Sequence, residues 1–463
     1  MRARESKTEL FESAPVFRAL MVMAVPTVIS QLIVLIYNMA DTWFIGRTDD
    51  PYMVAASSLV ATVFLMITGL ANLFGVGGGN LVVRLLGSRQ EDEARRVASL
   101  SLVMSAASAL AFSLLCLVFM DPLLRLLGAS DQTIGYARQY LIPVVVIGAL
   151  PTILANTMST MLRNIGYSRE AGFGISLGGV LNVGLDPLFM FVLLPRGSEV
   201  LGAALATLLS NIISCLYFVV VYRRVEGRTI LQLPRRIERI GGASMRAIFA
   251  VGVPAALNFL LYDLTNIIIN KLSSGHGDHA LAAMGIILKV ERLPLNICVG
   301  ICLAMMPLAA YNYASGNWKR MRAFFAVSRW CGLAVTVLCI GLYWPLAGQI
   351  MRAFIGDAQT VALGTVFLRA RCFAPTMMFL CFHMVHYLQA LGKGQLSLLL
   401  AAIRQLGLNI PILFLLDRFF GMNGIIWTQL IADALTALIS YLLCARVLRR
   451  LSGEGRNQKL QGV

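Results

Sequence analysis

Apolar runs long enough to cross a lipid bilayer follow one another along the 463-residue chain, separated by short polar connections. An apolar stretch of about 18 residues or more is typical of a membrane-spanning helix. The pattern therefore predicts an all-α polytopic membrane protein with twelve transmembrane helices. We place these spans at residues 17–45, 54–84, 97–119, 134–161, 171–195, 201–222, 246–271, 281–310, 324–348, 360–388, 395–416 and 422–445.

The composition agrees with this fold class. Charged residues make up only 13% of the chain, whereas soluble domains carry about 25%. All nine cysteines lie in apolar runs, where they act as small hydrophobic residues, so we expect neither a disulfide framework nor a zinc site. The polar residues before the first span have mixed charge and do not resemble a cleaved signal peptide.

The net charge of +16 is distributed in a way that predicts an orientation. Counted with the adjoining span ends, the N-terminus, the even-numbered connections and the C-terminus hold 27 of the 39 Lys and Arg residues. Because positive charge is retained on the cytoplasmic side, both termini are expected in the cytoplasm, as an even number of spans also requires. The basic segment at 223–239 is expected to contact anionic lipid of the bilayer, not nucleic acid.

The two halves of the sequence resemble each other at an offset of roughly 222–228 residues. The matched segments are Leu123–Thr133 over Ile350–Thr360, Pro26 and Asn38 over Pro254 and Asn266, and Gly202–Asn211 over Gly424–Asp433. We therefore expect two six-helix lobes, residues 1–230 and 231–463, related by a pseudo-two-fold axis along the membrane normal. Such repeats favour a transporter with a substrate path between or within the lobes.

Asp41 lies in the first apolar run and Asp186 in the fifth. A carboxylate at the centre of a membrane helix costs roughly 3 kcal/mol on insertion scales, and such residues usually bind a proton, a cation or a partner charge. The remaining polar residues of these spans are Tyr37, Asn156, Asn182 and Thr207. Residues four apart share a helix face, so Tyr37 lies beside Asp41, and Asn182 beside Asp186.

This group predicts an ion-coupling site. Carboxylate, amide and hydroxyl oxygens are hard ligands suited to Na⁺, with Asp41, Asn182, Asp186 and Thr207 as the metal ligands, and a proton can compete for the carboxylates. The alternative is that these groups only join helices by hydrogen bonds. For Asn156 and Thr207 the two interpretations remain equally open.

Further polar residues and prolines lie within the spans of both halves. Asp263, Glu291, Met158 and His383 are assigned to a substrate cavity, although Glu291 can equally belong to a locally neutralised cluster with Lys289 and Arg292. Asp433 is expected to bond to Arg404 or Gln405 on the neighbouring span. Pro26 and Pro254 interrupt helical hydrogen bonding and are proposed as hinges.

Several of these segments resemble one known family. The segments Ala24–Arg47, Met161–Phe191, Gly202–Thr207 and Phe420–Leu435 resemble helices 1, 4–6 and 12 of multidrug and toxic compound extrusion (MATE) transporters, and the likeness covers essentially the whole chain. It implies two lobes forming a V, in the inner (cytoplasmic) membrane of a bacterium. It also implies a monomer that exports organic cations in exchange for Na⁺ or H⁺ and needs no other cofactor. The family's ion site matches Asp41, Asn182, Asp186 and Thr207, with Tyr37 and Asn156 nearby.

Three alternatives remain. A lipid-linked oligosaccharide flippase would need a cavity rich in arginine to bind pyrophosphate, and few Arg residues lie in the spans. A major-facilitator-type transporter is the second. A membrane-bound transferase would need a nucleophile or metal group at a membrane face, and the sequence offers none.

Overall fold

The computed structural model describes residues 8–48, 50–234 and 241–460, apart from the side chains of residues 259, 263, 445 and 447–460. In these ranges all the extended regular elements are helices. The packing of its residues divides the chain into two compact units, Met1–Ala256 and Leu257–Val463. The boundary lies inside one helix, α10 (Gly242–Ser274). The lobe boundary expected at 230/231 lies in the connection before that helix and stays a prediction.

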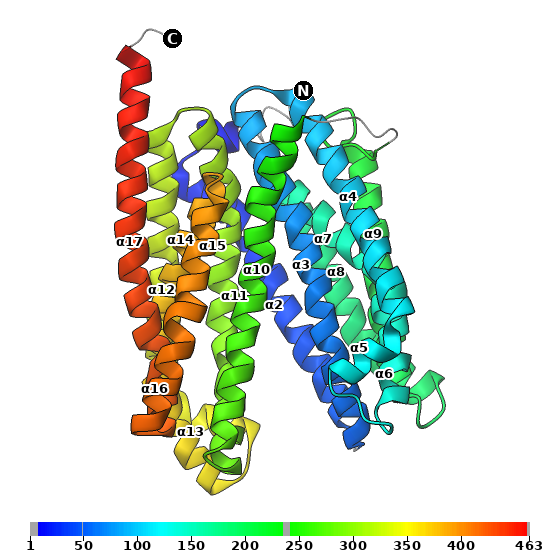
Figure 1. The fold of residues 1–463 in the computed structure, drawn as a ribbon. Coiled ribbons are helices and arrows are strands. Elements are labelled where there is room, and N and C mark those ends of the chain that lie inside the picture. Colours follow the sequence, from blue (N-terminus) through cyan, green and yellow to red (C-terminus); the bar gives the residue numbers. More distant parts are fainter. Residues whose placement is uncertain (1–7, 49, 235–240, 461–463) are drawn as a thin grey trace. The chain divides into compact units, whose positions relative to one another are not determined.

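The first unit contains, besides the first half of α10, a series of helices that Figure 1 colours from blue to green. They are α2 (Val16–Gly46), α3 (Pro51–Gly87), α4 (Glu91–Val118), α5 (Met120–Leu126), α6 (Ile134–Leu141), η1 (Ile142–Ile147), α7 (Ala149–Asn164), α8 (Ser168–Pro187), η2 (Leu188–Leu193) and α9 (Glu199–Val225). Helix α2 packs along α8, and α8 along α9.

The second unit begins with the second half of α10 and repeats the long helices of the first. Its further helices are α11 (Asp278–Ala314), α12 (Trp318–Phe354), α13 (Ala358–Arg371), α14 (Ala374–Ala390), α15 (Gly394–Ala402), η3 (Ile403–Asn409), α16 (Ile410–Phe420) and α17 (Met422–Leu460). Helix α11 packs against α12 and α14, and α14 against α17.

The predicted number of spans agrees with these helices. In the described part of the chain, ten helices are long and apolar enough to cross a membrane. Two further spans arise if each bent pair counts as one: Ile134–Ile147 with Ala149–Asn164, bent by 47°, and Ala358–Arg371 with Ala374–Ala390, bent by 45°. These pairs coincide with the fourth and tenth predicted spans. The all-α, multi-pass fold class is therefore confirmed.

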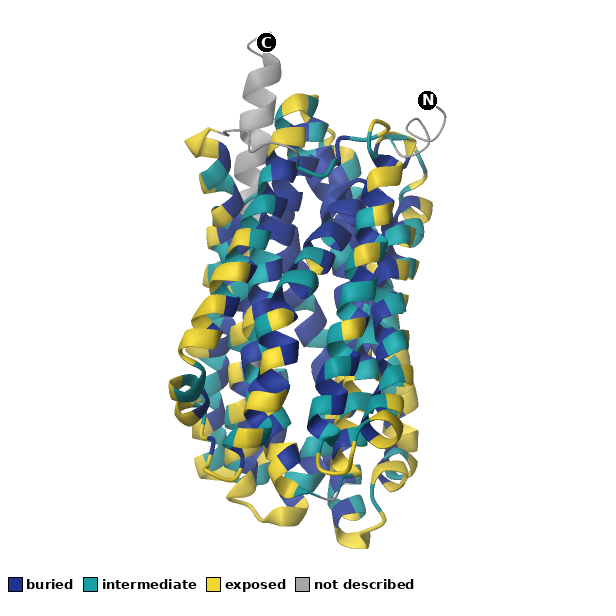
Figure 2. Cartoon of the chain, turned by 90° about the vertical axis from the view of Figure 1, so that its right-hand side faces the viewer, coloured by how far each residue is buried: buried dark blue, intermediate teal, exposed yellow. Residues whose placement is uncertain are grey.

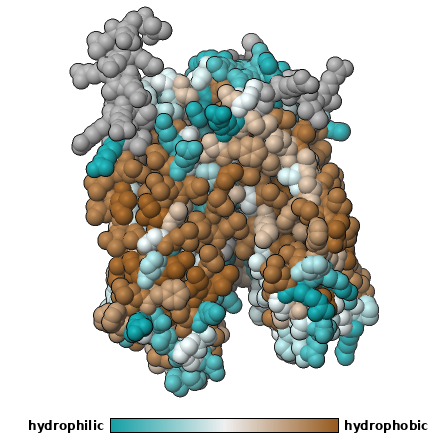
Figure 3. All heavy atoms as spheres, in the orientation of Figure 1, coloured by the Kyte–Doolittle hydropathy of each residue, from teal (hydrophilic) through white to brown (hydrophobic). Residues whose placement is uncertain are grey.

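The exterior of the helices is apolar, as a lipid environment requires. Large hydrophobic side chains such as Trp330 and Phe17 are 65% and 60% exposed. On the face shown in Figure 3, hydrophobic residues cover the middle of the helices and hydrophilic residues gather at their ends. Figure 2 shows that the helices bury one side and expose the other.

Three spans contain a π-helical turn, and each turn has a proline in or beside it. Pro143 lies within η1, Pro187 ends the helix before η2, and Pro411 is the second residue after η3. Proline has no backbone N–H and therefore cannot complete the α-helical hydrogen-bond ladder, which accounts for local widening. Single π turns are frequent at functional sites.

Glycines allow close approach of helices inside the first unit. A Cβ on Gly77 would lie 2.3 Å from the carbonyl oxygen of Ile248, and a Cβ on Gly252 only 2.1 Å from that of Leu73, so α3 and α10 meet backbone to backbone. Gly75–Gly79 lies in unbroken helix. Close helix packing, and not unwinding, explains this glycine-rich stretch.

Candidate functional site

Asn182 and Asp186 lie one turn apart on the same face of α8, as the sequence predicted. The Asn182 amide Nδ2 donates to Asp186 Oδ1 and to Thr207 Oγ1 of α9, both at 3.2 Å. Asn182 is 3% exposed and Asp186 is fully buried. One amide therefore joins the carboxylate of α8 to the hydroxyl of α9.

Asp41 reaches the same region from α2. The Tyr140 hydroxyl of α6 donates to Asp41 Oδ2 at 3.3 Å, and Tyr140 also lies within hydrogen-bonding reach of Thr207. Asp41 and Asp186 are close enough for their charges to interact. Tyr140 thus links the residues of α2 and α9, a role that the sequence analysis missed.

A glycine brings α2 and α8 together at this level. The Cβ that Gly179 lacks would lie 2.8 Å from Ile33 Cγ2 and 3.0 Å from Tyr37 Cδ1. The absence of a side chain on α8 therefore lets the Tyr37 ring lie against the helix backbone. Asp41 follows Tyr37 by one turn on the same face of α2, which directs its carboxylate toward Asp186.

Three residues of this group, Asp41, Asn182 and Asp186, have acceptor oxygens without a donor. Asp41 Oδ1, Asp186 Oδ2 and Asn182 Oδ1 are buried and have no hydrogen-bond partner in the described part of the chain. Most buried polar atoms in proteins are paired, so three such oxygens in one group require an explanation. Three hard oxygen acceptors with two carboxylates form the type of site that binds a small cation or a proton.

Asn156 and Met158 of α7 do not join this hydrogen-bonded group. The Asn156 side chain is exposed, and its amide donates to the carbonyl oxygen of Thr152 in its own helix at 2.9 Å. Met158 is only 3% exposed and packs in the core of the first unit. Their assignments to ion coupling and to a substrate cavity stay predictions.

In the second unit, Glu291 of α11 forms a buried ion pair. Its Oε1 accepts from Arg371 Nε of α13 at 2.7 Å, and the two side chains are 5% and 2% exposed. The sequence analysis assigned Glu291 to a substrate cavity or, equally, to a charged cluster with Lys289 and Arg292; its ion-pair partner in the structure is Arg371, eighty residues away.

Two other residues assigned to the substrate cavity also belong to the second unit. His383 is fully buried, receives or donates a hydrogen bond with Ser328 Oγ at 2.7 Å, and stacks on Phe325 at 4.6 Å between ring centroids. It lies within side-chain packing. The side chain of Asp263 lies outside the described residues.

The expected bond between Asp433 and the neighbouring span is confirmed. Arg404 Nε donates to Asp433 Oδ1 at 2.6 Å, and Arg404 Nη2 donates to Oδ2 at 3.1 Å. The proposed hinge residues Pro26 and Pro254 lie inside the continuous helices α2 and α10.

Known proteins resemble this chain over almost its whole length. The chain is 30% identical to the multidrug export protein MepA of Staphylococcus aureus strain NCTC 8325 over 97% of its length and 98% of the relative. It has the same identity and coverage with MepA of Staphylococcus saprophyticus. A solved structure of a multidrug resistance MATE family transporter of the MOP superfamily, in an outward-facing conformation, matches with a TM-score of 0.90 at 22% identity, covering 96% of this chain and 98% of that one.

The sequence profile of the MatE family matches both halves separately, at residues 26–188 and 254–415. The two ranges begin at Pro26 and Pro254. They cover most of the membrane helices, and the relatives cover the rest of the chain. The chain therefore belongs to the MATE family and is a membrane transporter rather than an enzyme.

Proposed function

We propose that this transporter exports lipophilic organic cations in exchange for Na⁺ or H⁺, and that the ion binds between Asp41 and Asp186. The observation that carries the proposal is the set of three buried oxygens without a donor, on Asp41, Asp186 and Asn182. The name of the Staphylococcus aureus relative, a multidrug export protein, supports export of many compounds. Because one transport cycle couples entry of the ion to export of the compound, the ion gradient drives release of the compound.

Ion binding has a direct structural effect in this proposal. With both carboxylates charged, Asp41 and Asp186 repel each other. A proton or Na⁺ removes that repulsion and draws α2 toward α8, with Thr207 and Tyr140 completing the shell. The same oxygens serve either ion, so the proposal covers both.

Pro26 gives α2 a place to bend. It cannot donate to the carbonyl of Val22, and the adjacent Thr27 hydroxyl instead donates to the Met23 carbonyl oxygen at 2.8 Å. The bend therefore needs no main-chain hydrogen bond to break at this position. Pro26 lies about four turns before Asp41, so a small change of angle there displaces the carboxylate considerably.

Reconstituted vesicles with an imposed Na⁺ or proton gradient test the proposal. We expect Asp41→Asn and Asp186→Asn each to lower ion-driven efflux roughly tenfold or more, because a hydrogen bond to a charged group contributes about 1.5–3 kcal/mol. Asp131→Asn is the matched control, since that carboxylate pairs with Arg125 at an exposed site. Full ion-driven efflux in both site variants would contradict the proposal, and gradient-independent movement of a lipid-linked oligosaccharide would favour a flippase.

The same proposal includes an orientation, with both termini in the cytoplasm and the chain in a bacterial inner membrane. The distribution of Lys and Arg supports it. Fusion of a fluorescent protein or of alkaline phosphatase to the C-terminus tests it, because the first is active only in the cytoplasm and the second only outside. Phosphatase activity without fluorescence would overturn the orientation.

A further inference from the structure

The second unit contains a buried polar cluster at the positions that correspond to the ion site of the first unit. The family profile matches each half, and at an offset of 223 residues the sequence of Gly184–Asp186 resembles that of Gly407–Asn409. The corresponding pairs are Tyr37 and Thr265, Asn182 and Gln405, Asp186 and Asn409, Thr207 and Gln429, and Asn211 and Asp433. The repeat therefore places polar residues on the same three helices of each half.

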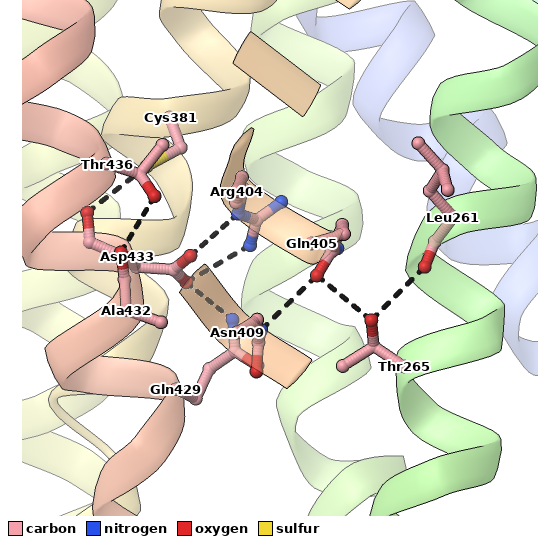
Figure 4. A network of polar contacts seen from close by, with 10 residues as sticks. All are labelled: Leu261, Thr265, Cys381, Arg404, Gln405, Asn409, Gln429, Ala432, Asp433 and Thr436. Carbon is pink, nitrogen blue, oxygen red and sulfur yellow. Dashed lines mark hydrogen bonds and ion pairs between the residues drawn. The ribbon is translucent and has the colours of Figure 1, made fainter. Parts of the chain in front are cut away.

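These residues form one continuous network, shown in Figure 4. Thr265 Oγ1 of α10 and Asn409 Nδ2 both donate to Gln405 Oε1, at 3.0 and 3.2 Å. Asn409 Nδ2 also donates to Gln429 Oε1 at 3.1 Å, and Gln429 Nε2 donates to Asp433 Oδ2 at 2.6 Å. The network thus runs from α10 through η3 to α17.

The charges of this network differ from those of the first unit. Its single carboxylate, Asp433, accepts hydrogen bonds from Nε and Nη2 of Arg404. The Cζ atom of Arg404 also lies 4.7 Å from the ring centroid of Phe382. Asp433 is fully buried and Arg404 is 3% exposed. Nearby Glu291 carries its own partner, Arg371.

The two clusters also differ in whether their carboxylate oxygens accept hydrogen bonds. Three donors satisfy both oxygens of Asp433, whereas Asp41 and Asp186 each keep a buried oxygen without a donor. Among the described residues of the second cluster, Asn409 Oδ1 is the buried side-chain atom without a hydrogen-bond partner. The position of Arg404 itself corresponds to Leu181 in the first unit. A positive charge is therefore built into one cluster and missing from the other.

We propose that Arg404 is the internal cation of a repeat-related ion site, so that the second unit carries a cation site occupied by the chain's own guanidinium. A buried carboxylate that loses such a partner is an uncompensated charge, which strongly destabilises the fold until another cation pairs with it. Removal of the Arg404 side chain therefore opens a site for a small monovalent cation, and guanidinium fits it best because it reproduces the two-pronged bond to Asp433. The inference concerns the second unit and stands independently of antiport.

Thermal unfolding of the purified full-length protein in detergent tests this site without any transport assay. We expect Arg404→Ala to lower the unfolding temperature by several degrees, and low, non-denaturing concentrations of guanidinium chloride to restore at least half of the loss. Choline chloride at the same concentration is the salt control. NaCl, in a separate arm, shows whether Na⁺ enters the vacated site; a smaller recovery than with guanidinium is expected.

The double variant Arg404→Ala/Asp433→Asn separates cation binding from general effects of the salt. It has the same space but no carboxylate, so guanidinium is expected to give it no stabilisation. Equal stabilisation of the single and double variants, or none in either, would overturn the proposal.

A second pair of variants decides the matter if Arg404→Ala does not fold. Arg404→Met keeps most of the volume and leaves Asp433 unpaired, whereas Arg404→Met/Asp433→Asn removes both charges. We expect the yield of folded protein to be severalfold higher for the double variant. Equally poor yields would show that Arg404 matters through its packing alone, and would refute the proposed cation role.

Discussion

Tyr140 is the residue that holds Asp41 in the ion site of the first unit. Its hydroxyl is the hydrogen-bond donor that the described structure gives to that carboxylate, at 3.3 Å, and its position beside Thr207 extends the link to α9. A phenol at this position fixes one oxygen of Asp41 and leaves the other for the ion.

Tyr140→Phe is therefore expected to weaken ion binding while preserving the fold. A neutral hydrogen bond contributes about 1 kcal/mol, so the ion concentration that gives half-maximal efflux should rise roughly fivefold. Ion titrations of efflux in reconstituted vesicles measure this. Tyr136→Phe is the control, one turn earlier on α6, and an equal effect of both variants would show that the hydroxyl of Tyr140 has no special role.

Glu291 and Arg371 are expected to stabilise the second unit as a pair. Breaking a buried ion pair on one side costs about 3–5 kcal/mol, because a charge is left without compensation. Arg371→Gln should therefore lower the unfolding temperature more than the double variant Glu291→Gln/Arg371→Gln, as measured in detergent. If Glu291→Gln leaves stability unchanged and abolishes binding of an organic cation, the carboxylate has the substrate role instead.

At this scale the sequence predicts what lies on one helix and little of what lies across helices. Asn182 and Asp186 are one turn apart, and Arg404 was an evident partner for Asp433 because both lie on adjacent spans. Tyr140 lies in the fourth span, 99 residues from Asp41, and Arg371 lies in the tenth span, 80 residues from Glu291. Nothing in the local pattern distinguishes them from packing residues.

At the scale of elements, α2 and α8 meet at a glycine. A Cβ on Gly172 would lie 2.6 Å from the carbonyl oxygen of Pro26, a contact with backbone that cannot rotate away. The close approach places the proposed hinge directly against α8. A single methyl group added at Gly172 would therefore obstruct a bend of α2 at Pro26.

Gly172→Ala is expected to destabilise the protein by about 1–3 kcal/mol, as overpacking of a dense interior does, and to lower ion-driven efflux. Thermal unfolding and vesicle assays measure the two effects. Gly184→Ala provides the control on the same helix, because a Cβ there meets nothing within 4 Å. Similar losses in both variants would show that contact with Pro26 is not responsible, since Ala itself favours a helix over Gly.

The length and apolar character of the spans predicted the elements well, because a bilayer imposes both. The breaks within elements were less accessible. The bends of 47° and 45° divide the fourth and tenth spans, yet the apolar run of the fourth span passes through its break without interruption. The π turns η1 and η2 also leave the apolar pattern intact, and only their prolines mark them.

At the scale of the whole molecule, a shared fold carries different charges in its two units. The sequence analysis expected a repeat of the fold without a repeat of the ion site. The structure adds that corresponding positions do form a polar cluster in the second unit, with Arg404 supplying its cation. The sequence concealed this because the amide Asn409 occupies the position of the carboxylate Asp186, and Arg404 occupies the position of the apolar Leu181.

If ion coupling belongs to the first unit alone, removing both charges of the second cluster should leave ion coupling intact. We expect Arg404→Gln/Asp433→Asn to keep the ion dependence of efflux within about twofold of the wild type, since no net charge changes and neutral amides retain hydrogen bonds. Asp186→Asn serves as the contrasting variant. Loss of ion dependence in the double variant would assign coupling to both units.

The π turns have a consequence for how the chain tolerates changes of length. A π turn holds one residue more than an α turn. Deleting one residue of η1, such as Val146, can therefore restore a regular α-helical turn and leave Thr152 and the rest of α7 on their original faces. The same deletion within α9 would rotate everything beyond it by about 100°. Single-residue deletions should thus be accepted selectively at these three turns, and a deletion scan would reveal them as points of tolerance inside otherwise intolerant spans.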